Sequence, residues 1–90
     1  MFATTTDWSH TGWTDAMQEL MDTKYLPMFK QFGALHFYYI ATSDTTARSV
    51  TIWPDEATAM AAMDQLRGGA SADTGATIVA TAQGNVLGSM

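Results

Sequence analysis

Residues 34–53, with the sequence ALHFYYIATSDTTARSVTIW, decide the fold of this chain. Residues 34–42 and 47–53 are rich in aromatic and β-branched side chains, and the turn-forming sequence SDTT separates them. Two such segments joined by a short turn predict an antiparallel β-hairpin. In the first segment the two alternating faces are both largely apolar: Leu35, Phe37, Tyr39 and Ala41, and Ala34, His36, Tyr38 and Ile40. Because a face in water would carry polar residues, both faces of this strand are predicted to be covered.

An amphipathic helix is predicted before the hairpin. Its apolar residues recur at helical spacing but change phase near Pro27, from Trp13, Met17, Leu20 and Met21 to Tyr25, Met28, Phe29 and Phe32. Proline lacks the N–H that an uninterrupted helix uses, and its ring crowds the preceding turn. The helix is therefore predicted to bend or break near residues 24–26, to resume one residue out of phase, and to stop at Gly33.

A second helix is predicted directly after the hairpin. It opens at Pro54-Asp55-Glu56, where Asp55 is suited to cap the first turn. Its expected apolar face consists of Ala59, Met60, Met63 and Leu66, with Ala62 at the edge. The pair Gly68-Gly69 is predicted to end this helix.

Two further strands complete the pattern. Residues 76–83 (ATIVATAQ) predict the last strand, and Gly84-Asn85 predicts a turn after it. Residues 2–8 predict a threonine-rich first strand with one face made of Phe2, Thr4, Thr6 and Trp8. The order β-α-β-β-α-β predicts one α+β domain over residues 1–90, of the ferredoxin-like type, with two helices on one face of an antiparallel sheet.

The composition predicts a second buried surface. The chain has 90 residues, of which 47% are hydrophobic and only 14% are charged, whereas a typical soluble domain is about 25% charged. A lone domain of this size buries only about 60% of its unfolded surface. The strand over residues 34–42 locates the apolar excess, because two helices on one face of a sheet leave the other face open. We therefore expect self-association through that face.

Charge and residue usage exclude several classes of partner. The net charge is −5 and the four basic residues, Lys24, Lys30, Arg48 and Arg67, are scattered, whereas nucleic-acid binding needs clustered positive charge. No apolar run approaches the roughly 20 residues of a membrane span, and residues 1–10 do not resemble a signal peptide. We therefore expect a cytoplasmic protein that binds neither nucleic acid nor membrane.

The sequence offers no metal or cofactor motif. It contains no cysteine, which excludes disulfides and thiolate ligands. Its two histidines, His10 and His36, lack the spacing of known metal-binding motifs. No cofactor and no metal are therefore expected.

The chain resembles the dimeric α/β-barrel superfamily, and in particular proteins related to antibiotic-biosynthesis monooxygenases. The resemblance rests on the step Phe32-Gly33 at the end of the first helix and on residues 50–57, VTIWPDEA, where a strand ends in Trp and runs into a helix through an acidic segment. It implies a homodimer packed sheet against sheet, with a pocket between sheet and helices for an aromatic or polycyclic substrate. In catalytic members oxygen chemistry proceeds there without metal or flavin. The threonine-rich first strand departs from the usual apolar pattern.

Four residues are candidates for a site. His36 and Tyr38 share one face of their strand, and an imidazole could act as a general base there; a packed or interfacial histidine is the alternative. Arg48 could hold a substrate anion, or could form an ion pair at the sheet surface. Trp53 could form the wall of a substrate pocket, or could pack at the corner between strand and helix.

Two functions remain open at this point. The first is a homodimer that binds a small apolar or aromatic molecule and acts as a cofactor-independent monooxygenase, with His36 and Tyr38 as catalytic residues and Arg48 and Trp53 as substrate-binding residues. The second is a non-catalytic dimeric module with a structural or regulatory role. Whether His36 and Tyr38 line a cavity beside the helices discriminates the two. The cluster Trp8, His10 and Trp13 could form the mouth of such a cavity, or a loop packed by its own aromatic rings.

Overall fold

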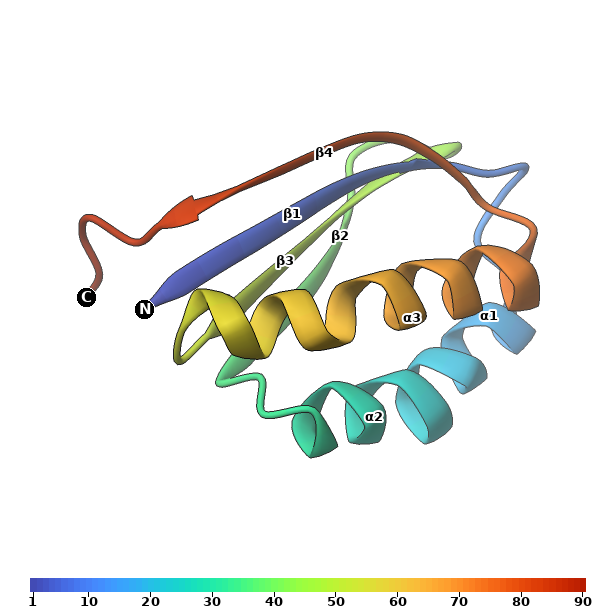
Figure 1. The fold of residues 1–90 in the computed structure, drawn as a ribbon. Helices are drawn as coiled ribbons and strands as arrows, with labels where there is room; N and C mark the ends of the chain where they lie inside the picture. The colour runs from blue at the N-terminus through green and yellow to red at the C-terminus, as the bar shows by residue number, and fades with distance from the viewer.

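The computed structural model describes residues 1–90 and has the predicted order of strands and helices. The first helical segment consists of three consecutive pieces, and both helical segments lie on the same side of the sheet (Figure 1). The elements are β1 (Phe2–Ser9), α1 (Asp15–Leu20), the π-helical turn η1 (Met21–Tyr25), α2 (Leu26–Gln31), β2 (His36–Ala41), β3 (Thr46–Trp53), α3 (Glu56–Thr74) and β4 (Thr77–Asn85). None of the helices is both long enough and apolar enough to span a bilayer.

The four strands form one antiparallel sheet in the order β2-β3-β1-β4. Central strands β1 and β3 pair along their full length, from Phe2 opposite Trp53 to Ser9 opposite Thr46. The pairing of β1 with β4 shifts by one residue between Asp7 and Trp8. An α+β chain with this sheet and two helical segments is compatible with the predicted ferredoxin-like fold.

Strand β1 buries the face that the sequence predicted, although half of that face is threonine. Phe2, Thr4, Thr6 and Trp8 are all buried, and the residues between them are only half-buried. The hydroxyl of Thr4 accepts a hydrogen bond from Nε1 of Trp53 at 3.0 Å and donates one to the sulfur of Met63. The buried hydroxyl is thus paired rather than isolated, which is the condition for burying a polar group at little cost.

The predicted phase change in the first helix is confirmed, and its cause is a π-turn. The N–H of Leu26 bonds to the carbonyl of Met21, five residues earlier. This wider turn adds one residue just before Pro27, which has no N–H to donate. As a result Tyr25 is buried while the side chain of Lys24 lies near the surface.

Helix α3 begins as predicted, but it does not end at Gly68-Gly69. Asp55 caps it by accepting a hydrogen bond from the N–H of Thr58 at 2.8 Å. The helix then continues to Thr74 and stops at Gly75, whose φ of 72° is left-handed. Glycine weakens a helix without breaking it, so the stop depends on the left-handed residue and not on the first glycines along the chain.

Two smaller predictions are also corrected. Met60 is 41% exposed, whereas Ala62, predicted at the edge of the apolar face, is fully buried. The buried stripe of α3 therefore runs through Ala59, Ala62, Met63 and Leu66. Gly84-Asn85 is not a turn but the end of β4, since it pairs with the first residues of β1.

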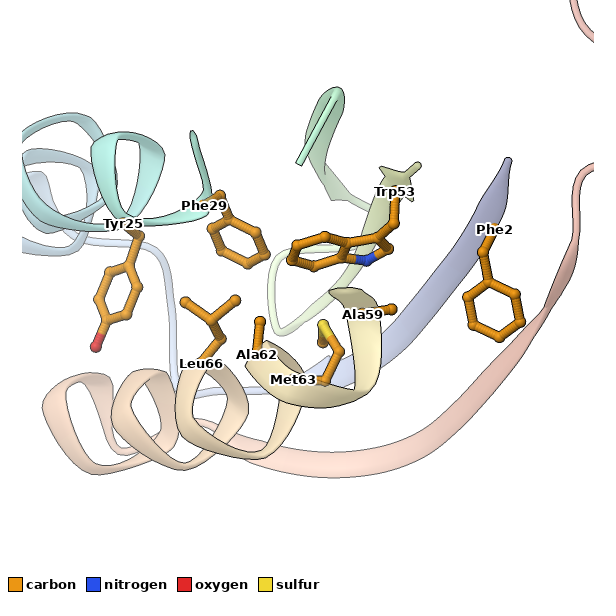
Figure 2. Packing of buried hydrophobic residues seen from close by; sticks show 8 residues of the cluster. All are labelled: Phe2, Tyr25, Phe29, Trp53, Ala59, Ala62, Met63 and Leu66. Atoms are coloured by element: carbon orange, nitrogen blue, oxygen red, sulfur yellow. The ribbon is translucent and has the colours of Figure 1, made fainter. Parts of the chain in front are cut away.

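The main core lies between the helices and the β1–β3 half of the sheet. Figure 2 shows the indole of Trp53, which has no exposed surface, in the middle of the eight buried residues, with Tyr25 on one side and Phe2 on the other. The ring of Phe29 lies 6.3 Å from this indole and 4.1 Å from Phe37, which attaches β2 to the same core. The corner between strand and helix is thus filled by the largest side chain available.

The position of the helix end can be tested with two alanine substitutions. Gly68→Ala places a better helix former inside α3, where the new methyl group meets no atom within 4 Å, and it should stabilise the protein by up to about 1 kcal/mol. Gly75→Ala also meets no atom within 4 Å, but it forces alanine into the left-handed region and should destabilise by about 1 kcal/mol. Urea unfolding measures both. Destabilisation by Gly68→Ala would contradict a helix that continues through this position.

Candidate functional site

A narrow apolar cavity lies between the helices and the sheet, beside the main core. It has about 40 Å³ of free space, and 13 of its 17 lining residues are hydrophobic. Strands supply one wall, including Trp8, Phe37 and Tyr39. The helices and the loop before α1 supply the other, including Met17, Met21 and, from the loop, Trp13. A concave site lined mainly by apolar and aromatic side chains, with few polar groups, is the usual form of a small-molecule site.

The strand wall of the cavity is fixed by a second bond between indole and hydroxyl. Trp8 is buried, and its Nε1 donates to the hydroxyl of Ser49 on β3 at 3.1 Å. Both residues line the cavity. Because the indole N–H is already paired, Trp8 offers a bound molecule its apolar ring.

The aromatic cluster predicted near the start of the first helix borders this cavity. The rings of Trp13 and Tyr39 are 4.9 Å apart, and His10 contacts Trp13 by its edge at 6.2 Å. Both Trp13 and Tyr39 also line an open groove of about 760 Å³ on the outer side. Burial raises the pKa of Tyr39 above its usual value. This tilted pair of rings lies between the cavity and the groove, and Trp13 is 37% exposed.

A hydrogen-bonded group of three side chains joins η1 to the last turns of α3. Tyr25 and Lys24 both donate to the same oxygen, Oδ2 of Asp73, each at 2.5 Å. Burial, and then the bond to Asp73, raise the pKa of Tyr25 well above its usual range. The hydrogen bonds from Lys24 and Tyr25 lower the pKa of Asp73. The hydroxyl of Tyr25 is therefore already hydrogen-bonded to Asp73, so Tyr25 lines the cavity mainly as an apolar ring.

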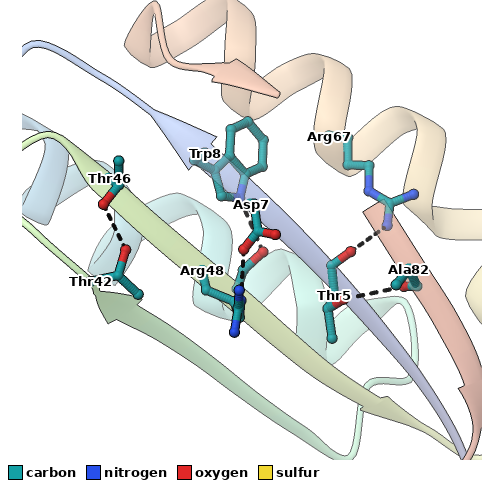
Figure 3. A network of polar contacts seen from close by, with 9 residues as sticks. Thr5, Asp7, Trp8, Thr42, Thr46, Arg48, Arg67 and Ala82 are labelled. Atoms are coloured by element: carbon teal, nitrogen blue, oxygen red, sulfur yellow. Dashed lines mark hydrogen bonds and ion pairs between the residues drawn. The ribbon is translucent and has the colours of Figure 1, made fainter. Parts of the chain in front are cut away.

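Arg67 is the one charged residue that lines the cavity. Its side chain reaches from α3 to β1, where Nε donates to the hydroxyl of Thr6 at 2.9 Å. Its Nη2 donates to the carbonyl of Thr5 at 3.2 Å (Figure 3). No carboxylate lies within ion-pair distance of it. Burial lowers the pKa of the guanidinium, an effect that the charge of Asp64 opposes. The cavity thus contains a fixed, half-buried positive charge.

Sequence reasoning missed Arg67, although a signal was present. It stands four residues after Met63 and eight after Ala59, on the buried stripe of α3. A charged residue at a stripe position faces the interior or its border, where it needs a polar partner. Threonine-rich β1 supplies that partner, and the two observations together would have pointed to this residue.

His36 and Tyr38 lie away from this cavity. Both are exposed on the face of the sheet opposite to the helices, where His36 is opposite Ile52 and Tyr38 is opposite Val50 on β3. Neither lines the cavity between sheet and helices. Their catalytic role stays a prediction, and a molecule in the cavity would meet other residues.

Arg48 and Trp53 lie on opposite faces of β3. Arg48 is exposed on the helix-free face, where Nε donates to Asp7 at 2.6 Å (Figure 3). This bond raises the pKa of its guanidinium. Trp53 is fully buried in the core and does not line the cavity. Of the four predicted site residues, His36, Tyr38 and Arg48 therefore share the helix-free face. Arg48 forms an ion pair and Trp53 packs at the corner between strand and helix, which are the alternatives given for these two residues above.

No group of three or more histidine or acidic side chains comes together in a way that could hold a metal ion. No protein-family model matches the chain, and no curated protein matches it in sequence. The resemblance to dimeric α/β-barrel proteins therefore stays a prediction.

Proposed function

We propose that this protein binds a small apolar organic molecule, best matched by one aromatic ring, in the cavity between its helices and its sheet. The observation that carries the proposal is the lining itself. Aromatic rings of Trp8, Trp13, Phe37 and Tyr39 surround the space together with flexible methionines. Such a site gains free energy from burying an apolar ring, at roughly 25 cal/mol per Å² of apolar surface.

The free space is too small for a ring unless side chains at its border move. About 40 Å³ accommodates one or a few water molecules. Met17 and Met21 form part of the border, and methionine is unbranched and readily changes its rotamer. Trp13 is partly exposed and can move outward into the groove. We therefore expect binding to widen the cavity by moving these three side chains.

Ligand binding without catalysis is the version of this function that we favour. The residues expected to act as general base and partner, His36 and Tyr38, lie on the other face of the sheet from the cavity. Of the two tyrosines that line the cavity, Tyr25 donates its hydroxyl hydrogen to Asp73. The monooxygenase activity stays a prediction of the resemblance.

Methionine methyl signals in NMR report on the cavity directly. In protein labelled with ¹³C at the methionine methyl groups, titration with toluene should shift the signals of Met17, Met21 and Met63, which line the cavity. The signals of Met60 and Met90, which are exposed outside it, should not move. They serve as controls within the same sample.

A filling substitution provides the matched control. Ala70→Leu, on the cavity wall of α3, should abolish the toluene shifts, whereas Ala61→Leu, exposed on the same helix, should preserve them. Two results would contradict binding in this cavity. One is that toluene shifts the signals of exposed and cavity methionines equally. The other is that the shifts remain unchanged in Ala70→Leu.

We also propose that two copies of the chain pack through the helix-free faces of their sheets, as in a dimeric α/β barrel. Support comes from the apolar residues there: Tyr38 is 58% exposed, Ile40 is 46% exposed, and Val50 and Ile52 lie beside them on β3. The ion pair of Asp7 and Arg48 neutralises the charges on this face. A second copy is the partner that this face fits best, because a twofold contact places the same neutral, apolar strands against each other.

Light scattering tests this dimer. The native protein at micromolar concentration should have twice the 9.7 kDa mass of the chain. Val50→Asp would place an unpaired charge in the contact and should shift the mass to that of one chain. Met60→Asp, on the exposed side of α3, should leave it unchanged. A native mass of one chain would refute the proposal.

A further inference from the structure

We propose that Arg67 makes this cavity selective for carboxylates, so that its ligands are small aromatic acids whose ring lies among the apolar side chains and whose carboxylate pairs with the guanidinium. This inference rests on the proposed ligand-binding function and adds the chemical class of the ligand. It follows from three features of Arg67: its fixed position, its unused donors and its lack of an ion-pair partner.

The guanidinium is held in place by one edge only. An arginine side chain has five N–H donors in a planar arrangement. Nε and one N–H of Nη2 bond to Thr6 and Thr5 on β1. The two N–H groups of Nη1 and the second one of Nη2 have no protein partner. Adjacent donors on Nη1 and Nη2 match the two oxygens of a carboxylate, which is the pairing that arginine favours.

The guanidinium of Arg67 has no ion-pair partner at the cavity. Asp64, three residues earlier on α3, is close enough to raise its pKa but is not within ion-pair distance and does not line the cavity. No acidic residue lines the cavity, and the two ion pairs of the protein involve Lys24 and Arg48 instead. Asp73, the acidic residue near the helix ends, is already bonded to Lys24 and Tyr25. Burial disfavours the charged form of Arg67, as the lowered pKa indicates. A bound anion would compensate for that burial.

The rest of the protein works against nonspecific anion binding. The net charge is −5, so the overall field repels anions rather than attracting them. Selectivity for a carboxylate must then come from close contact with Arg67. The narrow space also favours a planar carboxylate over a bulkier phosphate.

Benzoate and benzamide test this inference, because they have nearly the same shape and differ in charge. Titrations are followed by the methyl signals of Met17, Met21 and Met63 at neutral pH. In the native protein benzoate should bind about tenfold to a hundredfold more tightly than benzamide, the range expected for a hydrogen bond to a charged group. Arg67→Met should remove this preference, and Arg67→Lys should retain part of it because the charge remains.

The ratio of the two affinities is measured within each variant, so a loss of stability in Arg67→Met does not affect the comparison. Arg48→Met, which removes an arginine from the opposite face, should leave the ratio unchanged. Equal binding of benzoate and benzamide by the native protein would overturn the role of Arg67 while leaving the apolar site intact. Failure of both compounds and of toluene to shift the cavity methionines would overturn the site and this inference together.

Discussion

Two hydrogen bonds from tryptophan indoles to hydroxyl groups on the neighbouring strand hold the centre of this structure. Trp53 on β3 donates to Thr4 on β1, and Trp8 on β1 donates to Ser49 on β3. An unpaired buried donor or acceptor costs about 1–3 kcal/mol, and the structure contains no buried side-chain nitrogen or oxygen without a partner. The threonine-rich first strand can therefore occupy the middle of the sheet, because its buried hydroxyls have donors: Trp53 donates to Thr4, and Arg67 donates to Thr6.

The same arrangement accounts for the cavity and its charge. Trp53 fills the core completely, whereas Trp8 and Ser49 form a strand wall beside it. A third hydroxyl, that of Thr6, faces the same side and accepts from Arg67. Two neighbouring hydroxyls on the same face of β1 thus have different partners: Thr4 bonds to the core residue Trp53, and Thr6 bonds to the charged side chain of Arg67. The proposed ligand site lies beside the core of Trp53, between the strand wall of Trp8 and Ser49 and the helices.

Much of this fold was predictable, since hydrophobic periodicity marked the faces of the strands and even the extra residue near Pro27. The end of α3 could not be predicted in this way. A helix stop depends on a residue with left-handed backbone, and the sequence does not show that Gly75 has this conformation while Gly68 does not. The site was predicted less well. The alternation of side chains along the strand showed that His36 shares a face with Tyr38, but only the three-dimensional structure shows which face of the sheet the helices cover. The pairing of Arg67 with β1 joins residues 61 positions apart, and no local pattern reveals such a contact.

The most direct test of the central interaction is a double-mutant cycle on Thr4 and Trp53, measured by urea unfolding. Thr4→Val leaves the indole N–H buried without an acceptor, and Trp53→Phe removes the donor. If the pair holds the core as described, the double variant should be more stable than the sum of the single losses predicts, by about 1 kcal/mol. The cycle of Trp53→Phe with Thr5→Val, whose hydroxyl bonds to Ala82 instead, should be additive. Additivity within about 0.3 kcal/mol in the Thr4 cycle would contradict the account.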